Sequence, residues 1–168
     1  MAYNFNADEI FAIAEQIEVN GGKFYRKAAQ MVEEESTKKV LLDLAAMEDE
    51  HEVFFGGLRA ELEAEIGAPL TFDPEGEAAN YLKAFADGHV FEADKDATWK
   101  FKGDETPEDV LRTAIGFEKD AIVYFLGLKD LVSEDLGKAK IDALIKEEQH
   151  HIVILTRELT AIRKSKNS

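Results

Sequence analysis

The sequence contains no cysteine and has few basic residues for its number of acidic ones. Without cysteine the chain has no disulfides, no thiol nucleophile, no cysteine zinc site and no cysteine-ligated iron–sulfur or rubredoxin-type centre. Its 35 acidic residues against 20 basic ones give a formal net charge of -15, which argues against nucleic-acid binding because phosphate contacts need a basic surface. Any redox metal must therefore be held by Glu, Asp and His, and its electrons must come from another molecule.

Long apolar runs are also missing. No stretch approaches the roughly 18 apolar residues that a membrane-spanning helix needs. The first residues, MAYNFNADEI, lack the basic start and the apolar core of a secretory signal. We therefore expect no membrane partner and, by default, a cytoplasmic location. A length of 168 residues with 45% hydrophobic residues predicts a single domain, residues 1–168, with one core.

Apolar periodicity and helix-end signals predict four long helices and one short helix. The long helices are expected at residues 7–35, 37–66, 107–132 and 138–163, and the short one at about 74–87 within a crossover of residues 67–106. Asn6 with Glu9 forms a potential capping box for the first helix, and Ser36 can cap the second. Thr106 followed by Pro107 marks the start of the third.

The connection lengths predict how these helices pack. A helix of about 26 residues is roughly 39 Å long. Two short turns and one long crossover therefore predict an all-α bundle of two helical hairpins joined by a strap along its length. We expect the strap to return the third helix to start level with the first. Aromatic residues in the crossover, Phe91, Trp99 and Phe101, are expected to pack on the bundle.

Three residue types recur in the chain at an offset of 100. In each half a lone Glu is followed 30 residues later by Glu-x-x-His, which on a helix puts a carboxylate and an imidazole on one face, a turn apart. The matched residues are Glu18, Glu48 and His51 in the first half and Glu118, Glu148 and His151 in the second. Four carboxylates and two imidazoles are a ligand set for two metal ions in a helical bundle.

The positions of these residues favour a buried site. Glu18 lies on the apolar stripe of Ala14 and Ile17, and Glu48 lies beside Leu44. Unpaired carboxylates are almost never buried, so metal cations would supply the missing charge. Carboxylates and imidazoles suit two Fe ions, and Mn or Zn are also possible.

Two neighbouring residues leave alternatives open. His150 also forms a Glu-x-x-His, with Glu147, and is an alternative ligand to His151 although it breaks the offset of 100. Tyr25 lies two turns after Glu18 on the same helix face. It is a candidate catalytic residue that hydrogen-bonds a ligand carboxylate or passes an electron; alternatively, it is a core tyrosine.

Glycines inside the predicted helices are a further irregularity. Gly21 and Gly22 each cost roughly 1 kcal/mol relative to alanine in a helix interior. Either two helices approach closely there, as in a dimer contact, or the sequence tolerates a weak point. A homodimer is the default expectation for an oligomer.

The chain resembles the ferritin-like superfamily of di-iron carboxylate proteins, and within it the rubrerythrin-type domain without its rubredoxin part. The resemblance covers essentially the whole chain. It rests on EVNGGKFYRKAA from Glu18, EDEH at 48–51, GFEKDAIVYF around Glu118 and EEQHH at 147–151. It implies a ferritin-like four-helix bundle with a long crossover between helices 2 and 3. It further implies that all six matched residues bind two irons, with Glu48 and Glu148 bridging and Glu18 and Glu118 terminal.

The resemblance and the ligand chemistry together predict a di-iron oxidoreductase. It would reduce peroxide or O2 while oxidising Fe²⁺, with an external electron donor such as a rubredoxin-like protein. The sequence departs from rubrerythrins at Ile115, where they carry an additional Glu one turn before the third-helix ligand. A function of another class is iron binding, buffering or delivery with little turnover. Rapid peroxide consumption would favour the enzyme, and stoichiometric binding alone would favour the second function.

Overall fold

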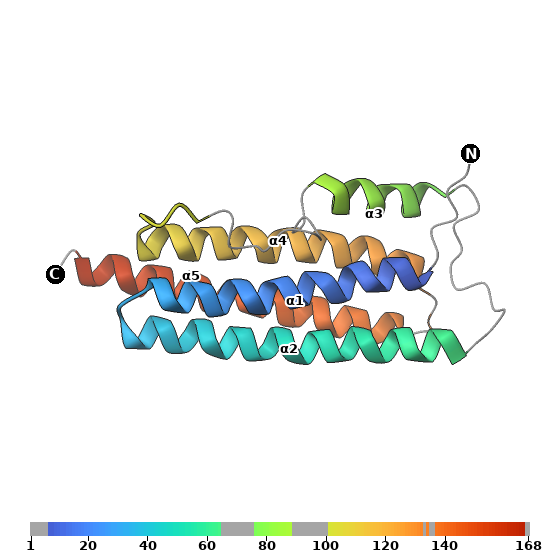
Figure 1. The fold of residues 1–168 in the computed structure, drawn as a ribbon, viewed down its shortest axis with the longest axis horizontal. Coiled ribbons are helices and arrows are strands. Elements are labelled where there is room, and N and C mark those ends of the chain that lie inside the picture. The colour runs from blue at the N-terminus through green and yellow to red at the C-terminus, as the bar shows by residue number, and fades with distance from the viewer. Residues whose placement is uncertain (1–6, 65–75, 89–100, 133, 135–136, 167–168) are drawn as a thin grey trace.

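Four long helices pack side by side, and one short helix lies on their outside (Figure 1). The computed structural model describes residues 7–64, 76–88, 101–132, 134 and 137–166. The helices are α1 (Ala7–Met31), α2 (Glu35–Ala64), α3 (Glu77–Gly88), α4 (Pro107–Leu131) and α5 (Lys138–Lys166). α1 packs along α2, α4 packs along α5, and α3 lies against α4. The predicted all-α architecture of two helical hairpins is therefore confirmed.

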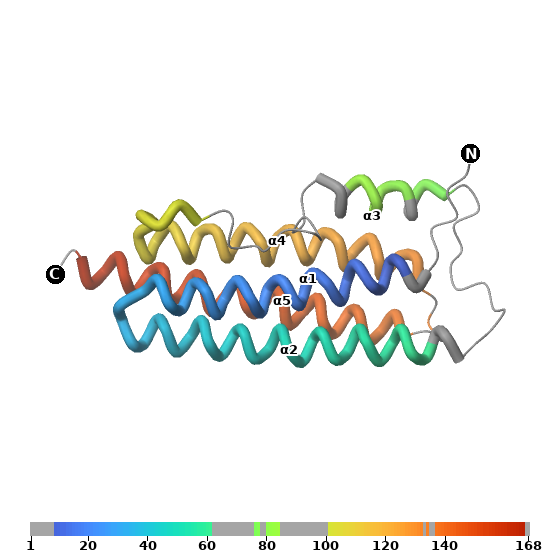
Figure 2. Tube along the Cα trace, viewed as in Figure 1, coloured from blue at the N-terminus to red at the C-terminus, as the bar shows by residue number. Residues whose placement is uncertain are grey.

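α4 runs antiparallel to α1, so the expectation that both helices start level with each other was wrong (Figure 2). Near the end of α4, the Tyr124 hydroxyl donates a hydrogen bond to the Ile10 carbonyl near the start of α1, at 3.0 Å. Just before α4, Phe101 stacks on Phe24 of α1 with ring centroids 5.1 Å apart. The crossover therefore joins opposite ends of the bundle and leaves α2 and α4 parallel. Phe91 and Trp99 lie outside the described residues.

Two predicted helix starts have different outcomes. Thr106 is the N-cap of α4: its hydroxyl accepts a hydrogen bond from the Asp109 amide at 3.2 Å, and the Asp109 carboxylate accepts one from the Thr106 amide at 3.0 Å. The Ser36 cap was wrong, because α2 begins one residue earlier and the Glu34 carbonyl accepts the Lys38 amide at 2.9 Å. Ser36 lies within the first turn instead.

The far end of α5 continues beyond the expected residue. It extends past Arg163 to Lys166, and the side chains of both residues contact Glu108 in the first turn of α4, at 3.2 and 3.1 Å. α1, in contrast, ends at Met31, before residue 35. The expected capping at Asn6 and the expected start of the short helix at residues 73–74 lie outside the described residues.

Between the four long helices lies an apolar core. Its largest fully buried side chains include Phe24, Phe55, Tyr124 and Phe125, and burying a side chain of this kind contributes about 1.5–3 kcal/mol. Within this core the helices also bury charged side chains, which form the site described below. Among the described residues, no helix has the length and apolar character to cross a membrane.

Candidate metal centre

Each of the four long helices contributes ionisable side chains to one buried cluster. α1 supplies Glu18, α2 supplies Glu48 and His51, α4 supplies Glu118, and α5 supplies Glu148 and His151. None of the six is more than 5% exposed. The structure thus brings together all six residues that recur at the offset of 100. Their role as metal ligands stays a prediction.

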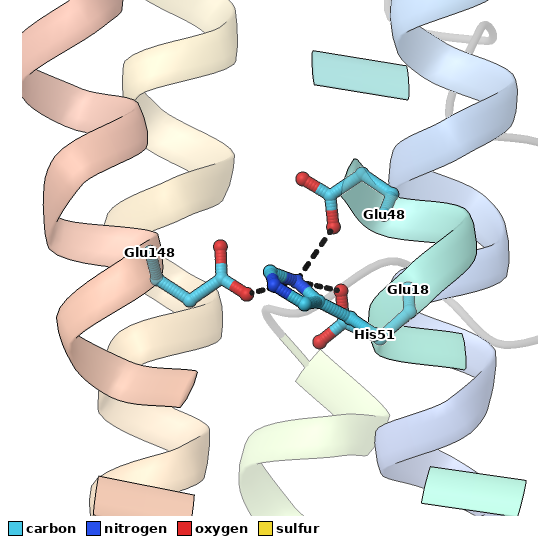
Figure 3. Close-up of side chains that lie close together, drawn as sticks. All are labelled: Glu18, Glu48, His51 and Glu148. Carbon is cyan, nitrogen blue, oxygen red and sulfur yellow. Dashed lines mark ion pairs between the residues drawn. The ribbon is translucent and has the colours of Figure 1, made fainter. Parts of the chain in front are cut away.

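The first group of possible ligands surrounds His51 and comprises Glu18, Glu48, His51 and Glu148, here called the His51 group (Figure 3). The Nδ1 atom of His51 lies 2.8 Å from Glu148 Oε1, 3.5 Å from Glu18 Oε2 and 3.8 Å from Glu48 Oε2. One ligand atom from each of the four residues lies within 4.8 Å of the others. These atoms come from three helices, so the group forms only when the bundle is assembled.

The second group surrounds His151 and comprises Glu48, Glu118, Glu148 and His151, here called the His151 group. The Nδ1 atom of His151 lies 3.0 Å from Glu148 Oε2, 3.3 Å from Glu48 Oε1 and 3.4 Å from Glu118 Oε1. The contacts repeat those of the His51 group with the two halves of the chain exchanged.

Glu48 and Glu148 belong to both groups. Each directs one carboxylate oxygen toward His51 and the other toward His151. The two imidazole rings face each other with centroids 5.5 Å apart and an interplanar angle of 18°. The cluster is therefore two overlapping sets of donor atoms that share two carboxylates.

Several of these buried atoms make no hydrogen bond of suitable geometry among the described residues, although the imidazole nitrogens and the Glu148 oxygens lie within ion-pair distance of each other. They are Glu18 Oε1, both carboxylate oxygens of Glu148, and the Nδ1 atoms of His51 and His151. Leaving a buried polar atom unsatisfied costs about 1–3 kcal/mol, and more when the group is charged. Carboxylate oxygens and imidazole nitrogens are ligands for divalent iron, manganese and zinc. The donor set therefore fits two divalent cations, which would satisfy these atoms.

In the metal-free protein, protons reduce the buried negative charge on two carboxylates. Burial raises the pKa of Glu18 well above 4.5, and the charge of Glu148 adds to the effect. Burial likewise raises the pKa of Glu118, with a contribution from Glu48. Both carboxyl groups therefore favour their neutral form when no cation is bound.

The two imidazoles are held in their charged form. Burial alone would lower their pKa values, but the surrounding carboxylates outweigh it, raising the pKa of His151 to about 12 and that of His51 well above 6.5. Burial would raise the pKa values of Glu48 and Glu148. The pKa of Glu48 is nevertheless below 4.5 because Glu18 and both imidazoles contact its carboxylate, and that of Glu148 is below 4.5 because of its contacts with both imidazoles. Metal ions binding here would displace protons from the cluster.

Tyr25 lies directly beside the cluster. Its hydroxyl donates a hydrogen bond to Glu118 Oε1, and its side chain is buried. Burial and the nearby charge of Glu118 raise the pKa of Tyr25 well above 10, so the hydroxyl keeps its proton and acts as a donor. The structure thus places Tyr25 against a predicted ligand carboxylate, as one interpretation of the sequence expected. Its part in electron transfer stays a prediction.

The surroundings of Gly21 explain why a glycine occurs at this position inside a helix. A Cβ atom at this position would lie 3.2 Å from both Cδ and Oε2 of Glu48. The close approach is therefore between α1 and α2 of the same chain, and it leaves space for the shared carboxylate.

A small cavity opens beside Gly21 and the cluster. Its walls include the apolar residues Ile17, Phe24, Phe117 and Ala121, together with Glu18, Tyr25, Glu48 and Glu118. Its volume of about 10 Å³ is close to what one water-sized molecule needs.

The alternative ligands His150 and Glu147 lie outside the buried cluster. The His150 side chain is exposed, whereas His151 is buried. The Glu147 side chain is 65% exposed, yet its Oε2 lies 3.1 Å from Nε2 of His51. The sequence interpretation missed this contact. It joins residues 96 positions apart, and no local spacing indicates it.

Comparisons with known proteins support the fold. No protein-family model matches the chain, and no curated protein matches it. Among solved structures, the chain is similar to a protein from Thermotoga maritima named ferritin-like and diiron-carboxylate, with a TM-score of 0.61 and 22% sequence identity. The match covers 96% of this chain and 97% of that one. The chain therefore has the ferritin-like bundle fold.

Proposed function

We propose that the chain is a rubrerythrin-like di-iron carboxylate oxidoreductase that reduces peroxide or O2 while Fe²⁺ is oxidised at a dinuclear site. The observation that carries this proposal is the sharing of Glu48 and Glu148 between the two groups. Each directs one oxygen toward each imidazole, whereas Glu18 and Glu118 each serve one group. This arrangement supports bridging roles for the first pair and terminal roles for the second.

The surrounding residues suit a small oxidant. When bound, two ferrous ions would supply the two electrons that convert one H₂O₂ and two protons into two molecules of water. The cavity beside Gly21 has about the volume of one water molecule, and the apolar side chains of Phe24 and Phe117 form part of its wall. The hydroxyl of Tyr25 holds a proton against Glu118 at the edge of the same cavity.

The proposal requires a partner that returns electrons. The sequence has no cysteine with which to hold a cluster or rubredoxin-type centre of its own. An external donor such as a rubredoxin-like protein would therefore reduce the site between turnovers. We include a homodimer in the proposal as the commonest symmetric assembly.

Anaerobic Fe²⁺ titration followed by rapid mixing tests the function. The apo protein is titrated with Fe²⁺, then mixed separately with H₂O₂ and with O2 while near-ultraviolet absorbance is followed. We expect two irons per chain and oxidation that is faster with peroxide than with O2. The Glu148→Ala variant serves as the control, because it removes a carboxylate shared by both groups. It should bind neither iron and show no site-dependent oxidation.

Other outcomes separate the alternatives. Two irons with faster oxidation by O2 would indicate ferroxidase or oxygen-scavenging chemistry. Two irons that bind stoichiometrically without repeated turnover, even when a chemical reductant is supplied, would favour iron buffering or delivery instead. Failure to bind two metals would contradict the site itself.

A further inference from the structure

The two halves provide the same residue types for the two metal positions, but they differ at two positions where a side chain of one half hydrogen-bonds a predicted ligand from outside. At the offset of 100, Glu147 corresponds to Met47, and Tyr25 corresponds to Phe125. The first pair exchanges a carboxylate for a thioether, and the second exchanges a phenol for a phenyl ring. The first half therefore lacks the carboxylate at position 47, and the second half lacks the hydroxyl at position 125.

Glu147 acts on the His51 group. Its Oε2 lies 3.1 Å from Nε2 of His51, while Nδ1 of the same ring faces the carboxylates of Glu18 and Glu148. A neutral imidazole carries its proton on one nitrogen only. A carboxylate at Nε2 keeps the proton there and leaves the Nδ1 lone pair for a cation. The negative charge of the carboxylate also makes the Nδ1 atom a stronger electron-pair donor to the cation. Met47 carries no such charge.

Tyr25 acts on the His151 group in the opposite sense. Its hydroxyl donates to Glu118 Oε1, the same oxygen that lies 3.4 Å from Nδ1 of His151. A hydrogen bond to this oxygen draws charge from an atom that would bind the cation. In the other half Phe125 has no hydroxyl, and Glu18 Oε1 has no hydrogen-bond partner among the described residues. Within the described part of the chain, no tyrosine hydroxyl therefore draws charge from Glu18 when it binds a cation.

We propose that the two metal positions are unequal, and that the His51 group binds its divalent cation more tightly than the His151 group. This inference rests on the dinuclear site of the proposed function and adds the order in which it fills. Residues that hydrogen-bond metal ligands from outside typically change metal affinity by about 10–100-fold. We expect two binding steps at least about tenfold apart. The His51 group holds the resident ion, and the His151 group exchanges its ion.

Calorimetric and visible-absorbance titration of the full apo chain with Co²⁺, under anaerobic conditions, tests the inference without any turnover. Glu147→Met introduces the residue type found at the matching position of the first half and should weaken the tight step about tenfold or more. Met47→Glu introduces the residue type found at the matching position of the second half and should tighten the weak step. Glu50→Gln is the matched control, because Glu50 is exposed and lines the same surface pocket as Glu147. It should leave both dissociation constants unchanged.

Two further variants assign the steps to the groups. Glu18→Ala should remove the tight step and Glu118→Ala the weak one, since each residue belongs to one group only. Tyr25→Phe should tighten the weak step. Circular dichroism of each variant checks that the bundle remains folded.

Several results would overturn the inference. Repulsion between two bound cations can also separate two steps, so the variants decide the matter. Equal steps in the wild type, unchanged dissociation constants in Glu147→Met, or the same loss in Glu50→Gln would each contradict it. So would a reversed assignment by the Glu18→Ala and Glu118→Ala variants. Binding of one Co²⁺ or none by the wild type would instead contradict the dinuclear site and the proposed function with it.

Discussion

Replacing Gly21 with alanine should separate the stability of the bundle from its capacity to bind metal. Alanine in a helix interior is favoured over glycine by roughly 1 kcal/mol, and Gly21 lies within α1. The new Cβ would lie 3.2 Å from Cδ of Glu48, which is shorter than the 3.4–4 Å of ordinary contacts. Without metal the Glu48 side chain can move by the few tenths of an ångström required. The apo variant should therefore melt about 2–4 °C above the wild type.

With metal bound the same displacement becomes costly. Glu48 would then be held by two cations, and metal–ligand distances tolerate changes of only about 0.2 Å. A tenfold loss of affinity at one position removes about 1.4 kcal/mol of metal-dependent stabilisation. The rise in melting temperature on adding metal should therefore be smaller in Gly21→Ala than in the wild type by about 3–5 °C.

Differential scanning calorimetry of the apo and metal-loaded forms measures both effects. Gly57→Ala is the matched control: Gly57 lies within α2, and a Cβ there meets nothing within 4 Å. It should raise the melting temperature of both forms equally. If Gly21→Ala and Gly57→Ala respond to metal in the same way, then the space beside Glu48 is not needed for the site, and our reasoning about Gly21 is wrong.

Three other predictions follow from the cluster. Glu48→Ala should lose both metals together whereas Glu18→Ala weakens one position, and elemental analysis after dialysis would contradict this if Glu48→Ala retained two. The apo protein should melt below the metal-loaded protein in calorimetry, because a ligand that binds only the folded state stabilises it; equal melting temperatures would oppose the site. Metal-free stability should fall as the pH rises from 6.5 to 9. The pKa of His151 is raised from 6.5 to about 12 in the folded state, so its contribution is complete below pH 6.5 and is lost toward pH 12. A higher apo melting temperature at pH 9 would contradict this.

The sequence predicts most of the inner cluster because local and repeated signals agree there. Helical spacing alone puts His51 on the same face as Glu48, and the offset of 100 selects His151 over His150. The structure buries His151 and exposes His150, in line with that choice. Burial of Glu18 is likewise visible in advance from its apolar neighbours on α1.

Contacts between helices far apart in sequence were not predictable in this way. The direction of α4 depends on which end of the bundle the crossover reaches, and helical periodicity carries no information about that. The contact of Glu147 with His51 exists only because α2 and α5 meet at this level of the bundle. The Ser36 error has a local cause, since Glu34 and Ser36 are both near the start of α2 and the backbone of Glu34 accepts the first hydrogen bond.

The internal repeat also indicates which positions the chemistry constrains. Two cations between two hairpins need one terminal carboxylate, one shared carboxylate and one imidazole from each half, so the six inner positions must match in type. Residues that contact these ligands from outside carry no such requirement. Glu147 and Met47 differ, as do Tyr25 and Phe125. At these outer positions the sequence departs from its twofold pattern, and on this departure rests our inference that the two metal positions are unequal.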